Sequence, residues 1–302
     1  MLERAVEKLY DAFTYTSAVV CISITALMFA LLITESTPSI KKFGLSFLLS
    51  TSWDPYRGVF GGGVFIFGSF LTAFLALLVS LPIAVGVALF ISEYTPRALK
   101  PVFSSLIELL AGVPSVVYGL WGLMWLAPLM RSYIQPWIIK HLGFIPFLRG
   151  EPIGVGVLTT SLVLALMILP IMSVITYESM ELVPNEIREG AYALGASKGD
   201  VCILIVKSSS RSLIAGCVLG LGRAFGETMV TAMLIGGSYT LPRSLLDPAY
   251  TIASLIVHEF RYAYAEALYR SALTELALIT LIISVFTSLL GRKIAAKAVG
   301  YR

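Results

Sequence analysis

The chain has 302 residues, of which 57% are hydrophobic and 13% charged, and its 25 glycines raise the apolar share to about 65%, against roughly 45–50% in soluble domains. This composition excludes a disordered chain, and it leaves too few charges to cover the core of an ordinary soluble enzyme. The net charge of +4 comes from basic residues spread over short segments, which argues against nucleic-acid binding. We therefore expect an integral membrane protein that crosses the bilayer several times.

Six apolar segments are long enough to cross a bilayer as helices, which takes about 20 residues each. They cover residues 15–34, 64–91, 102–130, 154–177, 212–236 and 273–290. The first follows Arg4 and Lys8, but it is too long for a signal peptide and no small-residue cleavage site follows it. We expect it to be retained as a helix. Pro82, Pro114 and Pro170 lie inside three of the spans, where proline kinks are tolerated.

An even number of spans places both termini on one side of the membrane. With the termini inside, the inner segments hold twelve Lys and Arg residues and the outer loops hold nine, and the inner ones lie closer to the helix ends. This favours an N-in, C-in orientation. We expect one integral domain over residues 1–302, with an N-terminal helix at about 15–34 and a core at about 64–291. The stretch 251–264 has an apolar stripe at helical spacing, typical of a re-entrant or interfacial helix.

Sequence motifs for catalysis are missing. The chain has no phosphate-binding G-x-x-x-x-G-K-[ST] loop, no H-E-x-x-H and no G-x-S-x-G. Its three cysteines have no paired spacing, and its two histidines are far apart, so no metal site is expected. These absences argue against an enzyme and favour a pore, permease or scaffold. Any energy from ATP would have to come from another subunit.

The inner loop at 178–211 contains a predicted amphipathic helix. Asn185 is expected to cap its start, and Gly195 to end it. Ile187, Ala191 and Leu194 fall on one face. Such a helix on the inner surface is suited to docking on a partner, and the alternative is that it packs against the chain's own membrane helices.

This loop resembles the EAA loop of ABC importer permeases, which reads Glu-Ala-Ala, three residues, Gly, nine residues, Ile, one residue, Leu-Pro. Glu189, Ala191, Gly195 and Ile205 match, whereas Gly190 replaces the first alanine and Lys207-Ser208 replaces Leu-Pro. In that family the helix fits a cleft of the ATPase subunit and transmits its closure. The resemblance therefore implies a coupling site that includes Glu189, Ala191 and Gly195, and we add Leu194 to it as a member of the predicted face.

The fifth span carries two charges near mid-membrane, Arg223 and Glu227. Charged groups at that depth cost about 2.5–3.5 kcal/mol unless they are paired or hydrated. On a continuous helix they would share one stripe with Gly216, Gly220 and Thr231. One interpretation is a buried structural ion pair. The other is an anion contact, because the arginine fork suits phosphate or sulfate oxygens, with the carboxylate holding the guanidinium when no anion is bound.

A second resemblance is more specific. The segments GLGRAFGETM, at 220–229, and IELLAGVPSVVYGLWGL, at 107–123, resemble the C-type permease subunit of phosphate-specific ABC importers. In that family the matching arginine and glutamate are implicated in phosphate passage, which implies this role for Arg223 and Glu227. Thr231 shares their predicted stripe. Glu108 is a lone acid that either lines the path or has a structural role.

We expect a six-helix, all-α permease subunit with the type I ABC importer fold, in the cytoplasmic membrane of a prokaryote. The resemblance implies inorganic phosphate as substrate, a second A-type permease, a dimer of ATPase subunits and an outer phosphate-binding protein as partners, and alternating access as the mechanism. ATP and magnesium would bind the ATPase, and this chain would hold no cofactor. The alternatives are a permease for sulfate or molybdate, and a transporter or channel that acts without an ATPase.

Overall fold

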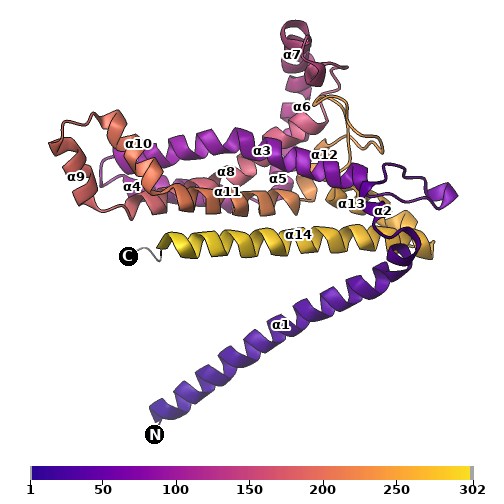
Figure 1. Ribbon diagram of the computed structural model, residues 1–302, viewed down its shortest axis with the longest axis horizontal. Helices are drawn as coiled ribbons and strands as arrows, with labels where there is room; N and C mark the ends of the chain where they lie inside the picture. Colours follow the sequence, from indigo (N-terminus) through magenta and orange to yellow (C-terminus); the bar gives the residue numbers. More distant parts are fainter. Residues whose placement is uncertain (1, 300–302) are drawn as a thin grey trace.

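The computed structural model describes residues 2–299, which are mostly helical (Figure 1). The main helices are α1 (Leu2–Phe43), α3 (Gly63–Leu89), α4 (Lys100–Ala111), α5 (Ser115–Trp121), α7 (Gln135–Leu142), α8 (Val157–Glu181), α9 (Asn185–Ala193), α10 (Lys198–Ser208), α11 (Ser210–Phe225), α12 (Met229–Leu234), α13 (Ile252–Ala263) and α14 (Ala267–Val299). Short elements are α2 (Ser46–Leu49), α6 (Ala127–Leu129), the 3-10 turns η1 (Pro55–Arg57) and η5 (Pro146–Leu148), and the π-helical turns η2 (Phe90–Tyr94), η3 (Gly122–Leu126) and η4 (Met130–Ile134).

Four helices in the described part of the chain are long and apolar enough to cross a membrane, and two bent helix pairs bring the total to six. The long ones lie at 10–43, 63–94, 157–181 and 267–294. This agrees with the six expected spans and corrects two of them. The span expected at 102–130 bends by 81° between α4 and α5, with Pro114 in the break. The sixth candidate span is the bent pair of α10 and α11, at 198–225 with a bend of 62°, and not the expected 212–236. Residues 226–228 separate α11 from α12 within the expected span.

Helix α3 packs along α8, and these two form the centre of the bundle together with α11 and α14 (Figure 1). Their contact surfaces hold small and branched side chains, including Ala73, Ala76 and Leu164, which are fully buried. Pro82 and Pro170 lie inside α3 and α8 without ending them, as expected. Close packing of small residues is how helices associate where water is absent.

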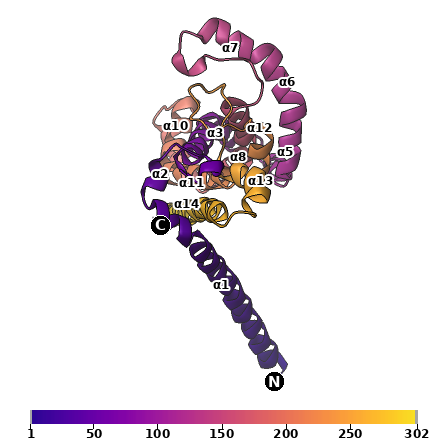
Figure 2. The same ribbon diagram turned by 90° about the vertical axis from the view of Figure 1, so that its right-hand side faces the viewer.

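Helix α1 diverges from the bundle, and Figures 1 and 2 show it attached only near one end. There, Glu35 pairs with Arg270 of α14 at 3.4 Å, and the Ser39 amide donates to the Ser271 hydroxyl at 3.0 Å. None of its most apolar stretch is buried against the rest of the chain. The starting end of α1, the last turn of α14 and α9 all lie at the same end of the molecule in Figure 1, as an even number of spans requires.

The opposite end is closed by an aromatic cluster and by α13. Trp53 contacts Phe65 with ring centroids 4.8 Å apart, and Phe60 stacks on Tyr269 of α14 at 5.1 Å. The helix expected at 251–264 is α13, which begins with a capping box formed by Thr251 and Ser254. Its first amide, of Ile252, donates to Ser69 of α3 at 2.9 Å. A short helix that cannot span is thus fixed to α3 by its N-terminus.

Two glycines of α3 should respond oppositely to alanine. A Cβ on Gly68 would overlap the carbonyl oxygen of Tyr250, whereas a Cβ on Gly86 would meet nothing within 4 Å. We expect Gly68→Ala to lower the free energy of unfolding by about 1–3 kcal/mol through overpacking. Gly86→Ala should leave it unchanged or raise it by about 0.5–1 kcal/mol because it lowers backbone entropy in the unfolded chain. Thermal unfolding of the two variants in detergent measures this, and equal melting temperatures would contradict the predicted contact.

Candidate functional site

The predicted inner helix is α9, with Pro184 at its N-cap and Asn185 as its first residue, so the cap lies one residue earlier than expected. Leu194 follows its last turn, and Gly195 reverses the chain with a φ of +84°. Such a φ is favourable for glycine because other residues carry a Cβ that clashes there. Ser197 then starts α10 with a capping box, in which its hydroxyl accepts from the Asp200 amide at 3.3 Å.

The face expected to hold Ile187, Ala191 and Leu194 is divided by the fold. Ala191 is half-buried and packs on an apolar cluster made of Ala88, Met180, Val183, Val201 and Ile205. Leu194 lies beyond the end of α9 and is 91% exposed, and Ile187 is also exposed. Glu189 and Gly195 are exposed as well. The predicted face therefore packs on the bundle through one small residue and leaves the other predicted coupling residues accessible.

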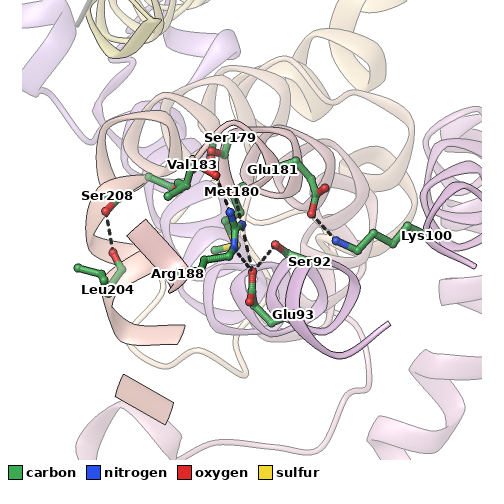
Figure 3. A network of polar contacts seen from close by, with 11 residues as sticks. Ser92, Glu93, Lys100, Ser179, Met180, Glu181, Val183, Arg188, Leu204 and Ser208 are labelled. Atoms are coloured by element: carbon green, nitrogen blue, oxygen red, sulfur yellow. Dashed lines mark hydrogen bonds and ion pairs between the residues drawn. The ribbon is translucent and has the colours of Figure 1, made fainter. Parts of the chain in front are cut away.

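An ion pair that the sequence analysis missed holds α9 in place (Figure 3). Arg188 donates from Nε and Nη2 to the Glu93 carboxylate, at 3.2 Å each, and from Nη2 to the Met180 carbonyl at 2.9 Å. Its Nη1 donates to the Val183 carbonyl. The side chains of Arg188 and Glu93 are only 15% and 9% exposed. One arginine thus joins α9 to η2 at the end of α3 and caps the free carbonyls at the end of α8.

A second ion pair lies beside the first. Lys100 of α4 donates to Glu181 of α8 at 2.7 Å. Together the two pairs line a cavity of about 650 Å³ at the inner end of the bundle, which also contains Arg97. The sequence shows these four residues only as opposite charges near the ends of predicted spans. It does not show which of them pair, because the paired residues are 95 and 81 positions apart.

The charged span is a broken helix. Arg223 lies in the last turn of α11, and Glu227 lies in the break before α12. Glu227 is 5% exposed, and its Oε1 accepts the amides of Met229 and Val230 at 3.2 and 3.4 Å, which caps α12. Thr231 donates to the Glu227 carbonyl at 2.8 Å. The carboxylate and the hydroxyl thereby satisfy backbone groups that the break would otherwise leave unpaired.

The break overturns the expected single stripe. Gly216 and Gly220 are buried against α8, and Glu227 and Thr231 are also buried, but Arg223 is exposed. No ion pair joins Arg223 to Glu227 within the described residues, so the structural ion pair is not formed in this subunit. Glu108 is exposed on α4, where it accepts from Ser104 at 3.2 Å, and no bond links it to the charged span. The structure thus brings Glu227 and Thr231 together and leaves Arg223 and Glu108 separate.

Residues 80–299 match the model of a family described as binding-protein-dependent transport system inner membrane component. The chain belongs to this family. The phosphate transport system permease protein PstC of Haemophilus influenzae is 40% identical over 297 residues, covering 97% of this chain and 94% of the relative. The PstC of Xylella fastidiosa is 42% identical over 251 residues, covering 82% of this chain and 77% of the relative. A solved chain from inward-facing conformations of the MetNI methionine ABC transporter is 13% identical, with a TM-score of 0.48 over 76% of this chain and 93% of that chain.

Membership of this family confirms the expected class. The chain is a multi-pass permease component of the cytoplasmic membrane with the all-α fold of type I ABC importers, and such components are parts of transporters, not enzymes. The match begins at residue 80, inside α3, and so includes η2, α9 and the broken span. In the described part of the chain, no group of three or more His, Cys, Asp or Glu residues is arranged to hold a metal ion.

The cap on α12 predicts how Glu227 variants differ. Glu227→Ala removes the acceptor for two buried amides and should lower the free energy of unfolding by about 0.5–2 kcal/mol. Glu227→Gln keeps an oxygen in the same place and should lose less. Thermal unfolding of the purified subunit compares the two, and equal losses would show that the cap adds nothing to stability.

Proposed function

We propose that this chain is a permease subunit of an ATP-driven importer that moves inorganic phosphate into the cytoplasm by alternating access. The observation that carries the proposal is the broken span, in which Arg223 lies exposed in the last turn of α11, just before the interruption. Its relatives are named as permease proteins of phosphate transport systems. Interrupted helices are the usual construction of substrate sites in membrane transporters, because unwound backbone at membrane depth is tolerated where it lines a cavity.

The environment of Arg223 supports an anion path. The residue forms no ion pair or hydrogen bond within the described chain and lies about 20 Å along α11 from Ser210. A guanidinium at such a depth would cost about 2.5–3.5 kcal/mol if it faced lipid. It therefore faces water or a second permease in the assembled transporter. There its planar fork suits two oxygens of a tetrahedral anion, and Glu227 and Thr231 hold the break beside it.

The exposed surfaces leave room for the partners that we propose. ATPase subunits dock on α9 and the turn that follows it, at Glu189, Ala191, Leu194 and Gly195. ATP hydrolysis with its magnesium takes place in those subunits and not in this chain. A second, A-type permease covers the open face of α11. A phosphate-binding protein delivers its ligand to the outer loops at 35–63, 131–153 and 237–272. Closure of the ATPases displaces α9, and the bundle opens outward. The anion bound at Arg223 thereby becomes accessible from one side of the membrane and then from the other. Glu108 remains a candidate path residue at the exposed edge of α4.

Arg223→Gln tests the path. Loss of a charge-assisted contact worth about 1.5–3 kcal/mol should reduce phosphate uptake at least about tenfold. Uptake of radiolabelled phosphate into proteoliposomes that contain the assembled transporter measures this, and the yield of intact complex serves as the control for folding. Full uptake by the variant would refute the role of Arg223. Uptake of sulfate or molybdate in place of phosphate by the unmodified transporter would refute the choice of substrate.

Gly190 offers a matched pair for the docking surface. A Cβ at this position meets nothing within 4 Å, so larger residues fit the isolated chain. Gly190→Trp should obstruct the ATPase cleft and prevent co-purification of the ATPase subunits. Gly190→Ala adds one methyl group, favours the helix by about 1 kcal/mol, and should keep docking intact. Retention of the ATPase by the tryptophan variant would show that this face of α9 is not the docking surface.

A further inference from the structure

The turn η2, which continues the inner end of α3, contacts the coupling segment on both sides of the Gly195 turn, where the coupling segment is residues 185–208 with α9 and α10. Glu93 binds Arg188 of α9. The ring centroid of the next residue, Tyr94, lies 3.8 Å from the Nζ of Lys198 at the start of α10. Glu93 and Tyr94 belong to the π-helical turn η2. Such turns are rare and often mark functional positions in helices. Two contacts from consecutive residues thus attach α9 and α10 to one turn of one helix.

Helix α9 has few other contacts that could pass on a displacement. It is nine residues long with no buried residue, and so short a helix is not stable by itself in water. Ala191 supplies its apolar contact with the inner cluster. Arg188 instead donates to acceptors on both η2 and the end of α8, and its planar fork fixes their relative directions (Figure 3).

The Glu93–Arg188 pair is also costly to break. Both side chains are largely buried, and removal of one partner leaves the other charge without its opposite charge. The neighbouring Lys100–Glu181 pair is more exposed and joins α4 to α8 without contacting α9. The Glu93–Arg188 pair is therefore the contact that involves α9, and the Lys100–Glu181 pair is a neighbouring contact that serves as its control.

Helix α3 extends from η2 to the broken span. About 35 Å of helix separate Glu93 from Phe70, whose ring packs edge to face on Phe225 with centroids 4.5 Å apart. Phe225 is the last residue of α11 and adjoins the break that holds Glu227. One helix thus touches the coupling segment at one end and the charged break at the other.

We propose that Glu93 and Arg188 are positioning residues of the transport cycle, which make η2 the point where displacement of α9 becomes displacement of α3. The proposal rests on the proposed function and deepens it, because it names the joint between ATPase docking and the anion path. Neither residue touches the substrate. Their substitution should separate docking from transport, whereas loss of the docking surface would abolish both.

The test uses the complete transporter, with its ATPase subunits and second permease, in proteoliposomes. Arg188→Gln, Glu93→Gln and the double variant are compared with Lys100→Gln as the matched control. Three quantities are measured: co-purification of the ATPase, stimulation of its hydrolysis by phosphate-loaded binding protein, and phosphate uptake. Thermal unfolding of each complex separates a loss of coupling from a loss of fold.

Each single variant should keep the ATPase at the unmodified ratio and lose stimulation and uptake at least about fivefold, the lower end of typical coupling between sites. The double variant should be no worse than the singles, because both remove the same contact. Lys100→Gln should stay within about twofold, because the Lys100–Glu181 pair joins α4 to α8 and does not hold α9. Unchanged stimulation in the singles, multiplied losses in the double, or loss of the ATPase itself would overturn the proposal. An unmodified complex that neither assembles nor transports would refute the proposed function instead.

Discussion

The absence of water inside the bilayer governs this structure, because every backbone group there must find its partner within the protein. Long helices meet this requirement without help. The interruption between α11 and α12 meets it through side chains: the Glu227 carboxylate accepts two amides, and the Thr231 hydroxyl binds the Glu227 carbonyl. The same two residues that were predicted as path residues are therefore the ones that make a break at this depth possible.

The two charges of the broken span are therefore treated differently. The buried carboxylate of Glu227 is stabilised within this chain, whereas the guanidinium of Arg223 is not. Glu227 obtains its hydrogen bonds from the start of α12, where the helix dipole also favours a negative charge. Arg223 sits in the last turn of α11, where the dipole favours a positive charge, but its side chain is exposed. The subunit thus presents an uncompensated cation on a surface that the assembled transporter must cover or hydrate.

At the inner end, charge replaces apolar packing as the means of attachment. Helix α9 buries none of its nine residues, so it is held by the Arg188 fork and by Ala191. An attachment through few, directed contacts leaves most of its surface to a partner. It also defines a direction for movement, because the acceptors of Arg188 lie on α8 and on the turn that ends α3.

The amino-acid sequence by itself determined the membrane class, the four continuous spans, the inner helix that ends near Gly195 and the short helix at 251–264, because apolar length, helical periodicity and glycine are local signals. The functional roles of the site residues remain predictions. Their predicted arrangement was wrong, because a single stripe with Gly216, Arg223 and Glu227 requires a continuous helix, and residues 226–228 interrupt it. Only the tertiary structure could pair Glu93 with Arg188, since partners 95 positions apart are chosen by how α3, α8 and α9 pack and carry no mark in the local sequence.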